Sequence, residues 1–157
     1  TLIGKAMQLC EWQAEQAEVS IDQPDGSVNP TVRGDPVLLE QVLINLLRNA
    51  IDANRERNPS TPSRIRITTR EAASNMVEIV IEDQGPGLDK EGIEHMFTPF
   101  FTRKADGLGL GLSMSRSIVD GFGGDLDAEP GTEGGLRLIF RLPHAHTKAL
   151  NRTSRDD

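Results

Sequence analysis

Residues Glu40 to Ala53 read EQVLINLLRNAIDA. Apolar side chains recur through this stretch at alternating intervals of three and one, from Leu39 to Ile51. Such spacing places them on one face of a helix. Asp35 and Pro36 lie just before it, and they are typical of a helix start because Asp caps free amides and Pro fits the first turn. We therefore predict a long amphipathic helix beginning near residue 35.

Three polar side chains follow a strip beside this apolar stripe. Asn45 and Asn49 lie one helical turn apart, with Asp52 next to them. Asparagine is a weak helix former, so its placement here suggests a use for the amide oxygen. Amide oxygens are suitable ligands for Mg²⁺, which prefers oxygen donors. The alternative interpretation is a polar helix edge that faces solvent.

A carboxylate ends a second apolar pattern. Val77, Ile79 and Ile81 alternate as in a strand, and Asp83 follows in the same parity before the turn 84–87, which reads QGPG. A buried carboxylate requires a partner, and it can accept a hydrogen bond from an exocyclic amine such as that of adenine. The alternative is an Asp that only stabilises the turn.

Two further stretches carry unusual composition. Residues 107–113 read GLGLGLS and lead into a predicted helix, an arrangement that can cradle phosphates with backbone amides, although flexible linkers look similar. Residues 97–104 read FTPFFTRK. Their Phe residues predict either a small hydrophobic cluster or an anchored hinge for a lid, from which Arg103 or Lys104 could reach phosphates.

The composition excludes several classes of partner. Hydrophobic residues make up 36% and charged residues 26% of the 157 residues, as in one globular domain. The net charge of −7 argues against nucleic acid or an anionic membrane as a partner. No apolar run is long enough to span a bilayer, and we expect the single cysteine, Cys10, to be buried as a small hydrophobe.

The order of predicted elements is mixed. We expect helices over 2–17, 35–57, 90–97 and 112–119, and strands over 19–21, 31–33, 65–69, 77–81, near 126 and over 136–142. The strands at 65–69 and 77–81 should pair as a hairpin. This order predicts an α+β sandwich with helices on one face of a mixed, mostly antiparallel sheet. We assign 1–143 to the domain and 144–157 to a disordered tail.

The four features together resemble the N box, first glycine box, F box and second glycine box of sensor histidine kinases. The stretches at 40–53 and 97–104 carry the resemblance, which runs from about residue 35 to 143. It implies the Bergerat fold, a two-layer α/β sandwich shared with type II topoisomerase, heat-shock chaperone and mismatch-repair ATPases. It also implies ATP and Mg²⁺ as cofactors.

The resemblance assigns roles to individual residues. It implies that Asn49 coordinates Mg²⁺, that Asn45 supports the phosphate side, and that Asp83 binds the adenine amine with Gly85 and Gly87 leaving room for the base. It gives catalytic roles to Asn45, Asn49 and Lys104. The remaining nucleotide-binding residues that it implies are Asp52, Arg103, Lys104, Gly107, Leu108, Gly109, Leu110, Gly111 and Leu112.

The chain departs from the family pattern at three places. Asp52 and Ala53 stand where many members carry a basic residue and then an aromatic one. The lid segment 101–107 is short. Gly135-Leu136 replaces a common Gly-Thr pair, so a hydroxyl is absent there, and Thr132 is a weak substitute.

The three histidines of the chain do not lie in the sequence setting of a phosphoacceptor. The resemblance therefore implies an upstream dimerisation and acceptor domain in the same protein, a response regulator as partner, and a monomeric fragment of a homodimeric parent. It implies a cytoplasmic domain and leaves open whether the parent is anchored in the inner membrane. Two other functions stay open: a nucleotide-sensing module without turnover, and an ATP-driven clamp of the topoisomerase type.

Overall fold

A computed structural model describes residues 2–23, 32, 34–57, 61–99, 111–132 and 134–144. Five strands of this part form one sheet in the order β1-β2-β3-β5-β4. The elements are α1 (Leu2–Gln16), β1 (Val19–Asp22), α2 (Pro36–Arg57), β2 (Ser63–Ala72), the 3₁₀ turn η1 (Ala73–Asn75), β3 (Met76–Glu82), α3 (Lys90–His95), α4 (Gly111–Gly121), β4 (Asp125–Pro130) and β5 (Leu136–Pro143).

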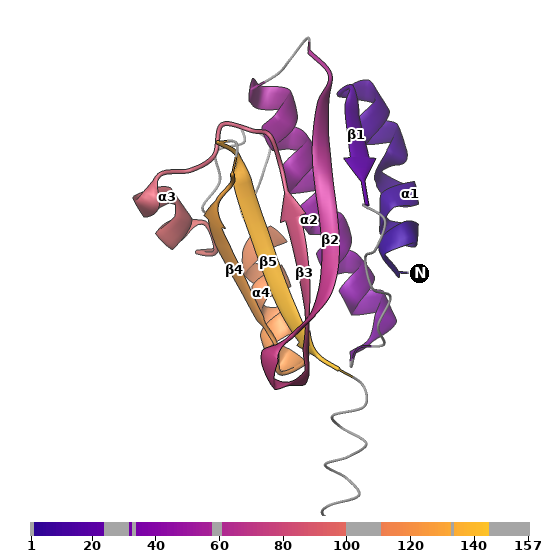
Figure 1. Cartoon of the computed structure of the whole chain (residues 1–157), viewed down its shortest axis with the longest axis vertical. Helices are drawn as coiled ribbons and strands as arrows, with labels where there is room; N and C mark the ends of the chain where they lie inside the picture. Colours follow the sequence, from indigo (N-terminus) through magenta and orange to yellow (C-terminus); the bar gives the residue numbers. More distant parts are fainter. Residues whose placement is uncertain are drawn as a thin grey trace, which may run out of the picture.

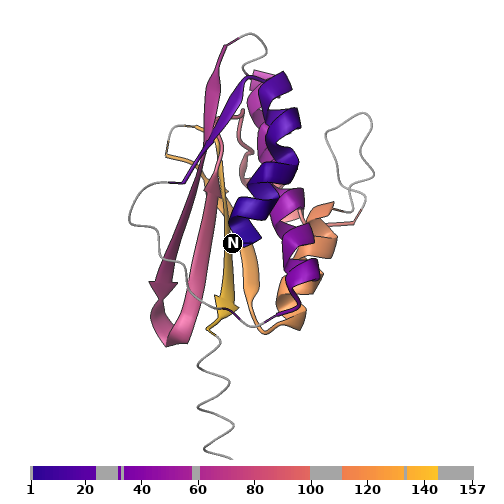
Figure 2. The same cartoon turned by 90° about the vertical axis from the view of Figure 1, so that its right-hand side faces the viewer.

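The helices α1, α2 and α4 cover one face of the sheet, as Figures 1 and 2 show, and the short helix α3 lies near one end of the sheet. Strand β1 pairs with β2 in parallel, while the pairs β2–β3, β3–β5 and β4–β5 are antiparallel. The predicted fold class, an α+β sandwich with a mixed, mostly antiparallel sheet, is therefore confirmed.

The core lies between α2 and the sheet. The predicted apolar stripe of α2 is buried from Leu39 to Ile51, and it packs against the inward residues of the strands, among them Ile65 and Ile81. Burial of each such side chain contributes about 1.5–3 kcal/mol. Cys10 is 1% exposed, so its predicted burial is confirmed.

Most element predictions agree with the structure. The hairpin pairs β2 with β3, with Ile67 opposite Ile81. The predicted helix over 90–97 ends earlier, at His95. Of the predicted strand at 31–33 only Val32 is described, in an antiparallel bridge to His144, and the predicted tail lies almost wholly outside the described residues. None of the described helices is long and apolar enough to cross a membrane.

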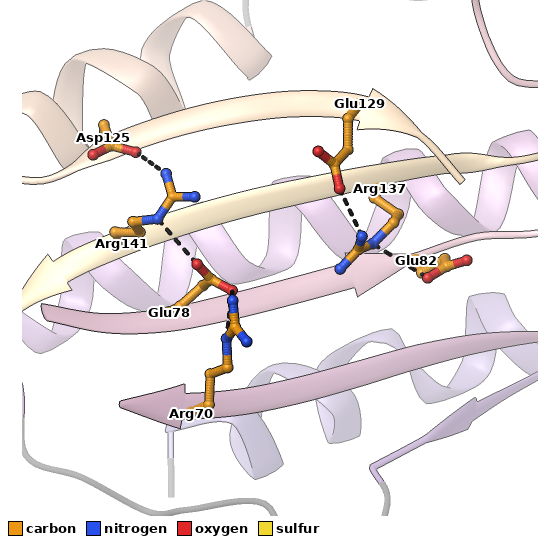
Figure 3. Close-up of polar contacts among 7 residues, drawn as sticks. All are labelled: Arg70, Glu78, Glu82, Asp125, Glu129, Arg137 and Arg141. Atoms are coloured by element: carbon orange, nitrogen blue, oxygen red, sulfur yellow. Dashed lines mark hydrogen bonds and ion pairs between the residues drawn. The ribbon is translucent and has the colours of Figure 1, made fainter. Parts of the chain in front are cut away.

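The other face of the sheet carries rows of charges that alternate in sign across strands (Figure 3). In one row Glu78, which is 5% exposed, lies between Arg70 and Arg141. Arg141 also pairs with Asp125 at 2.8 Å. Opposite charges on neighbouring strands stabilise the pairing, so this row ties β2, β3, β5 and β4 together.

We predict that Glu78→Ala lowers the free energy of unfolding by about 1–3 kcal/mol, because two guanidinium groups lose a buried hydrogen-bonded partner. The exposed Glu11 provides the matched control, and Glu11→Ala should change stability by less than about 0.5 kcal/mol. Urea denaturation measures both. Equal stabilities for the two variants would contradict a role for the charge row.

Candidate functional site

Asp83 directly follows β3, and its side chain is buried. It is 5% exposed, and its Oδ1 accepts hydrogen bonds from the Gly85 amide at 2.9 Å and the Leu136 amide at 3.1 Å. Neither hydrogen bond involves Oδ2. Burial raises the pKa of this carboxyl, and the two amide hydrogen bonds oppose that shift. The structure therefore holds a buried carboxylate and fixes its orientation through one oxygen.

Glycine is required at several positions around Asp83. A Cβ at Gly85 would lie 2.6 Å from the Cβ of Ala53, so the loop after β3 packs directly on α2. Gly87 has φ +72°, and a Cβ there would lie 2.6 Å from the carbonyl oxygen of Gly134. A Cβ at Gly135 would overlap the backbone of Asp83. These close approaches leave the carboxylate at the meeting point of α2, the loop 83–87 and the start of β5.

Leu136, where the resemblance led us to expect a hydroxyl, contacts Asp83 through its backbone. The backbone of Leu136 makes two hydrogen bonds with Asp83: its amide donates to Oδ1, and its carbonyl accepts from the Asp83 amide. Thr132, the weak substitute for this hydroxyl, makes its hydrogen bonds to another carboxylate. Both the amide and the Oγ1 of Thr132 donate to Glu82, at 3.1 and 2.7 Å, on the side of the sheet that carries the charge rows.

The polar strip of α2 lies against the start of α4. The Nδ2 of Asn45 donates to the Oγ of the buried Ser115 at 3.3 Å, and a Cβ at Gly111 would lie 3.9 Å from the Cγ of Asn45. Asn49, one turn further along, is half-buried. The N-terminus of α4 carries positive partial charge, so phosphates and an oxygen-ligated cation at Asn49 would fit side by side here.

Asp52 takes part in a different contact. Its Oδ1 accepts a hydrogen bond from the Nε2 of Gln13 on α1, at 3.1 Å. This carboxylate thus links the N-terminal helix to α2, three residues beyond Asn49.

Several predicted site residues lie outside the described part of the chain. These are Arg103, Lys104, Gly107, Leu108, Gly109 and Leu110. Of the Phe cluster only Phe97 is described; it packs against the core, and the Arg116 guanidinium of α4 lies 4.7 Å from its ring centroid. Helix α4 begins at Gly111, one residue before the predicted start at Leu112.

Two residues that the sequence interpretation overlooked attach the loop 83–87 to α2. The Oδ1 of Asn54 accepts a hydrogen bond from the Gln84 amide at 2.7 Å, and the Nη1 of Arg57 donates to the carbonyl of Gly85 at 3.0 Å. Asn54 lies in the apolar stripe, three residues after Ile51. A polar side chain at such a position requires hydrogen-bond partners, and this signal was available in the sequence.

Comparison with known proteins identifies the family of the chain. Residues 34–146 match the family model described as histidine kinase-, DNA gyrase B- and HSP90-like ATPase. The chain belongs to this family. Within it, the chain corresponds to the ATP-binding catalytic domain of sensor histidine kinases, because its curated relatives are sensor kinases.

Three relatives illustrate the match. The chain is 40% identical over 114 residues to the sensor protein FixL of Bradyrhizobium diazoefficiens, covering 73% of this chain and 22% of FixL. It is 44% identical over 101 residues to the C4-dicarboxylate transport sensor protein DctB of Rhizobium meliloti, covering 64% of this chain and 16% of DctB. It is 34% identical over 142 residues to the sensor histidine kinase ZraS of Klebsiella oxytoca, covering 90% of this chain and 30% of ZraS. The chain thus spans less than a third of each of these proteins.

Solved structures give the same result. The catalytic domain of histidine kinase ThkA superposes with a TM-score of 0.73 at 32% identity, covering 91% of this chain and 92% of that domain. Full-length ShkA in complex with AMPPNP superposes with a TM-score of 0.78 at 24% identity, covering 92% of this chain and 29% of ShkA, a likeness of fold.

The raised pKa of Asp83 predicts a pH-dependent stability. Folding favours the protonated carboxyl, so its contribution is fully present below the unfolded-state pKa of 3.8 and is lost as pH rises through the folded-state pKa. Asp83→Asn keeps an acceptor for the two amides and removes the charge. We expect this variant to equal or exceed the wild type in free energy of unfolding near neutral pH, with the difference shrinking on acidification.

Urea denaturation across the acidic range measures this difference. The control is Asp120→Asn, which removes a carboxylate from an exposed position of α4. If acidification instead destabilised the wild type relative to Asp83→Asn, the carboxylate would be the favoured form in the fold.

Proposed function

We propose that this domain places Mg·ATP for transfer of the γ-phosphoryl group to a histidine on an upstream dimerisation and acceptor domain of the same protein, from which it passes to an aspartate of a response regulator. The contact that carries the proposal is the packing of the Asp83 loop on α2 at Ala53, one turn beyond Asn49. In this proposal the carboxylate, the Asn strip and the start of α4 surround one bound nucleotide.

Each described residue has a defined task in this proposal. Asp83 accepts a hydrogen bond from the exocyclic amine of adenine, and Gly85 and Gly87 leave room for the ring. Asn49 supplies an amide oxygen to Mg²⁺, while Asn45, held by Ser115, lines the phosphate side. The bound Mg²⁺ supplies neutralisation of phosphate charge during transfer.

The proposal extends to residues of the 97–112 segment. Gly107, Leu108, Gly109, Leu110, Gly111 and Leu112 surround the phosphates, and Arg103 and Lys104 contribute positive charge. The N-terminus of α4 adds its dipole to the same charge balance. Catalysis is then by positioning and charge stabilisation: the bond from γ-phosphorus to the bridging oxygen breaks as the bond to the histidine nitrogen forms, and ADP leaves.

The proposed setting is a cytoplasmic domain of a homodimeric parent. The dimer contacts belong to the acceptor helices in this proposal, so the isolated domain is a monomer. Relatives several times longer than this chain support a multidomain parent.

The clamp function is disfavoured by one residue. A clamp requires a carboxylate one turn before the metal-binding Asn in order to activate water, and this position holds Asn45. Its amide donates to Ser115, which supports a positioning role and no proton-accepting one. A nucleotide sensor without turnover remains the second candidate, since its binding site would be the same.

The decisive experiment mixes this domain with the acceptor-helix domain of its own parent and γ-labelled Mg·ATP. We expect acid-labile label on the acceptor, reduced roughly 100-fold or more by Asn49→Ala, because a metal supplies several kcal/mol of charge stabilisation. Gln41→Ala is the matched control, an amide removed from an exposed position of the same helix, and it should transfer as wild type.

Other outcomes identify the competing functions. ATP binding without label on the acceptor would favour the sensor. Release of free phosphate in the absence of any acceptor would favour the clamp. Full transfer by Asn49→Ala would refute the assignment of the metal ligand.

A further inference from the structure

The loop that presents Asp83 is attached to the last two turns of α2 by two side chains of different kinds. Asn54 is fully buried, and its Oδ1 accepts from the Gln84 amide at 2.7 Å. Arg57, three residues on, donates to the carbonyl of Gly85 at 3.0 Å. Residues three apart lie on the same helix face, so both reach the same short stretch of backbone.

Asn54 is also anchored on its other side. Its Nδ2 donates to the Oγ of Ser63 and to the carbonyl of Arg64, both at 3.1 Å. The side-chain Oε1 of Gln84 in turn accepts from the Arg64 amide at 2.7 Å. The amide plane of Asn54 therefore cannot rotate without breaking bonds to the start of β2, and this fixes the direction in which Oδ1 holds the loop.

The attachment continues to the carboxylate. Asn54 and Arg57 restrain Gln84 and Gly85, and the Gly85 amide donates to Oδ1 of Asp83 at 2.9 Å. Each of these hydrogen bonds is at least partly shielded from water, where an unmet partner is costly. A shift of the Gln84–Gly85 backbone would release one of the two amides that orient the carboxylate.

We propose that Asn54 and Arg57 are positioning residues for base recognition: they hold the Gly85 amide against Asp83 and so determine how tightly the domain binds a nucleotide whose base carries an exocyclic amine. The inference rests on the proposed function for its ligand. A simpler role, in which Asn54 only joins α2 to β2, would leave the Gly85–Asp83 hydrogen bond intact when Asn54 is replaced.

The first test needs no ligand. Amide protons bonded to a carboxylate change chemical shift as it ionises, so the Gly85 and Leu136 amides of the ¹⁵N-labelled chain should both follow the titration of Asp83. In Asn54→Ala we expect the Gly85 response to be lost or strongly reduced and the Leu136 response to persist. Ser63→Ala is the matched control: it removes one partner of Asn54, leaves the bond to Gln84, and should keep both responses.

The second test measures ADP affinity by calorimetry with and without Mg²⁺. Asn54→Ala should weaken ADP binding about tenfold, the effect of one lost buried hydrogen bond. Arg57→Ala should weaken it about threefold, since its side chain is more exposed. In each variant, the ratio of the ADP dissociation constant measured with Mg²⁺ to that measured without Mg²⁺ should equal the wild-type ratio, because Asn49 is unchanged.

Two further variants complete the design. Asn54→Asp retains the acceptor for Gln84 and should recover part of the Gly85 response; it serves also if Asn54→Ala does not fold. Arg55→Ala, at an exposed neighbouring position, is the control for Arg57. Wild-type ADP affinity in Asn54→Ala and Arg57→Ala, or an unchanged Gly85 titration in Asn54→Ala, would overturn the inference. Failure of the wild type to bind ADP would instead refute the proposed function.

Discussion

The buried carboxylate of Asp83 imposes the main constraint on this domain. Burying an ionised group is unfavourable unless hydrogen bonds compensate it. Here the compensation comes from backbone amides of Gly85 and Leu136, which belong to different segments. The loop after β3 and the start of β5 must therefore meet at one point, and only glycine at 135 allows that approach. The site is built from the same contacts that close the end of the sheet.

One face of helix α2 packs in the core, and the adjacent face borders the proposed site. Its apolar stripe packs on the sheet, and the neighbouring strip carries Asn45 and Asn49 toward α4. Asn54 belongs to the stripe but makes the hydrogen bonds of a site residue. Because packing against β2 and β3 fixes the rotation of the helix, the positions of the two asparagines and of Asn54 cannot be adjusted independently. Rigidity of the core is in this way transmitted to the polar groups.

The sequence was sufficient for the fold and for the polar strip because both depend on periodicity. The stripe of α2 and the alternation in β2 each report which face is buried, and Asp83, in the parity of Ile81, is buried as expected. The partners of Asp83 could not be predicted in the same way. Leu136 acts through its backbone amide, which no side-chain pattern encodes, and the Arg57–Gly85 bond depends on the exact path of the loop. The direction of Thr132 toward Glu82 likewise depends on tertiary structure.

The bond from Gln13 to Asp52 changes how the charge of the proposed phosphate site must be balanced. Asp52 adds a carboxylate to the helix that bears Asn49, and it accepts a hydrogen bond from Gln13 of α1. In the proposed function the negative charge of a triphosphate is therefore met by Mg²⁺ at Asn49, the N-terminus of α4 and the basic residues Arg103 and Lys104, and not by this part of α2.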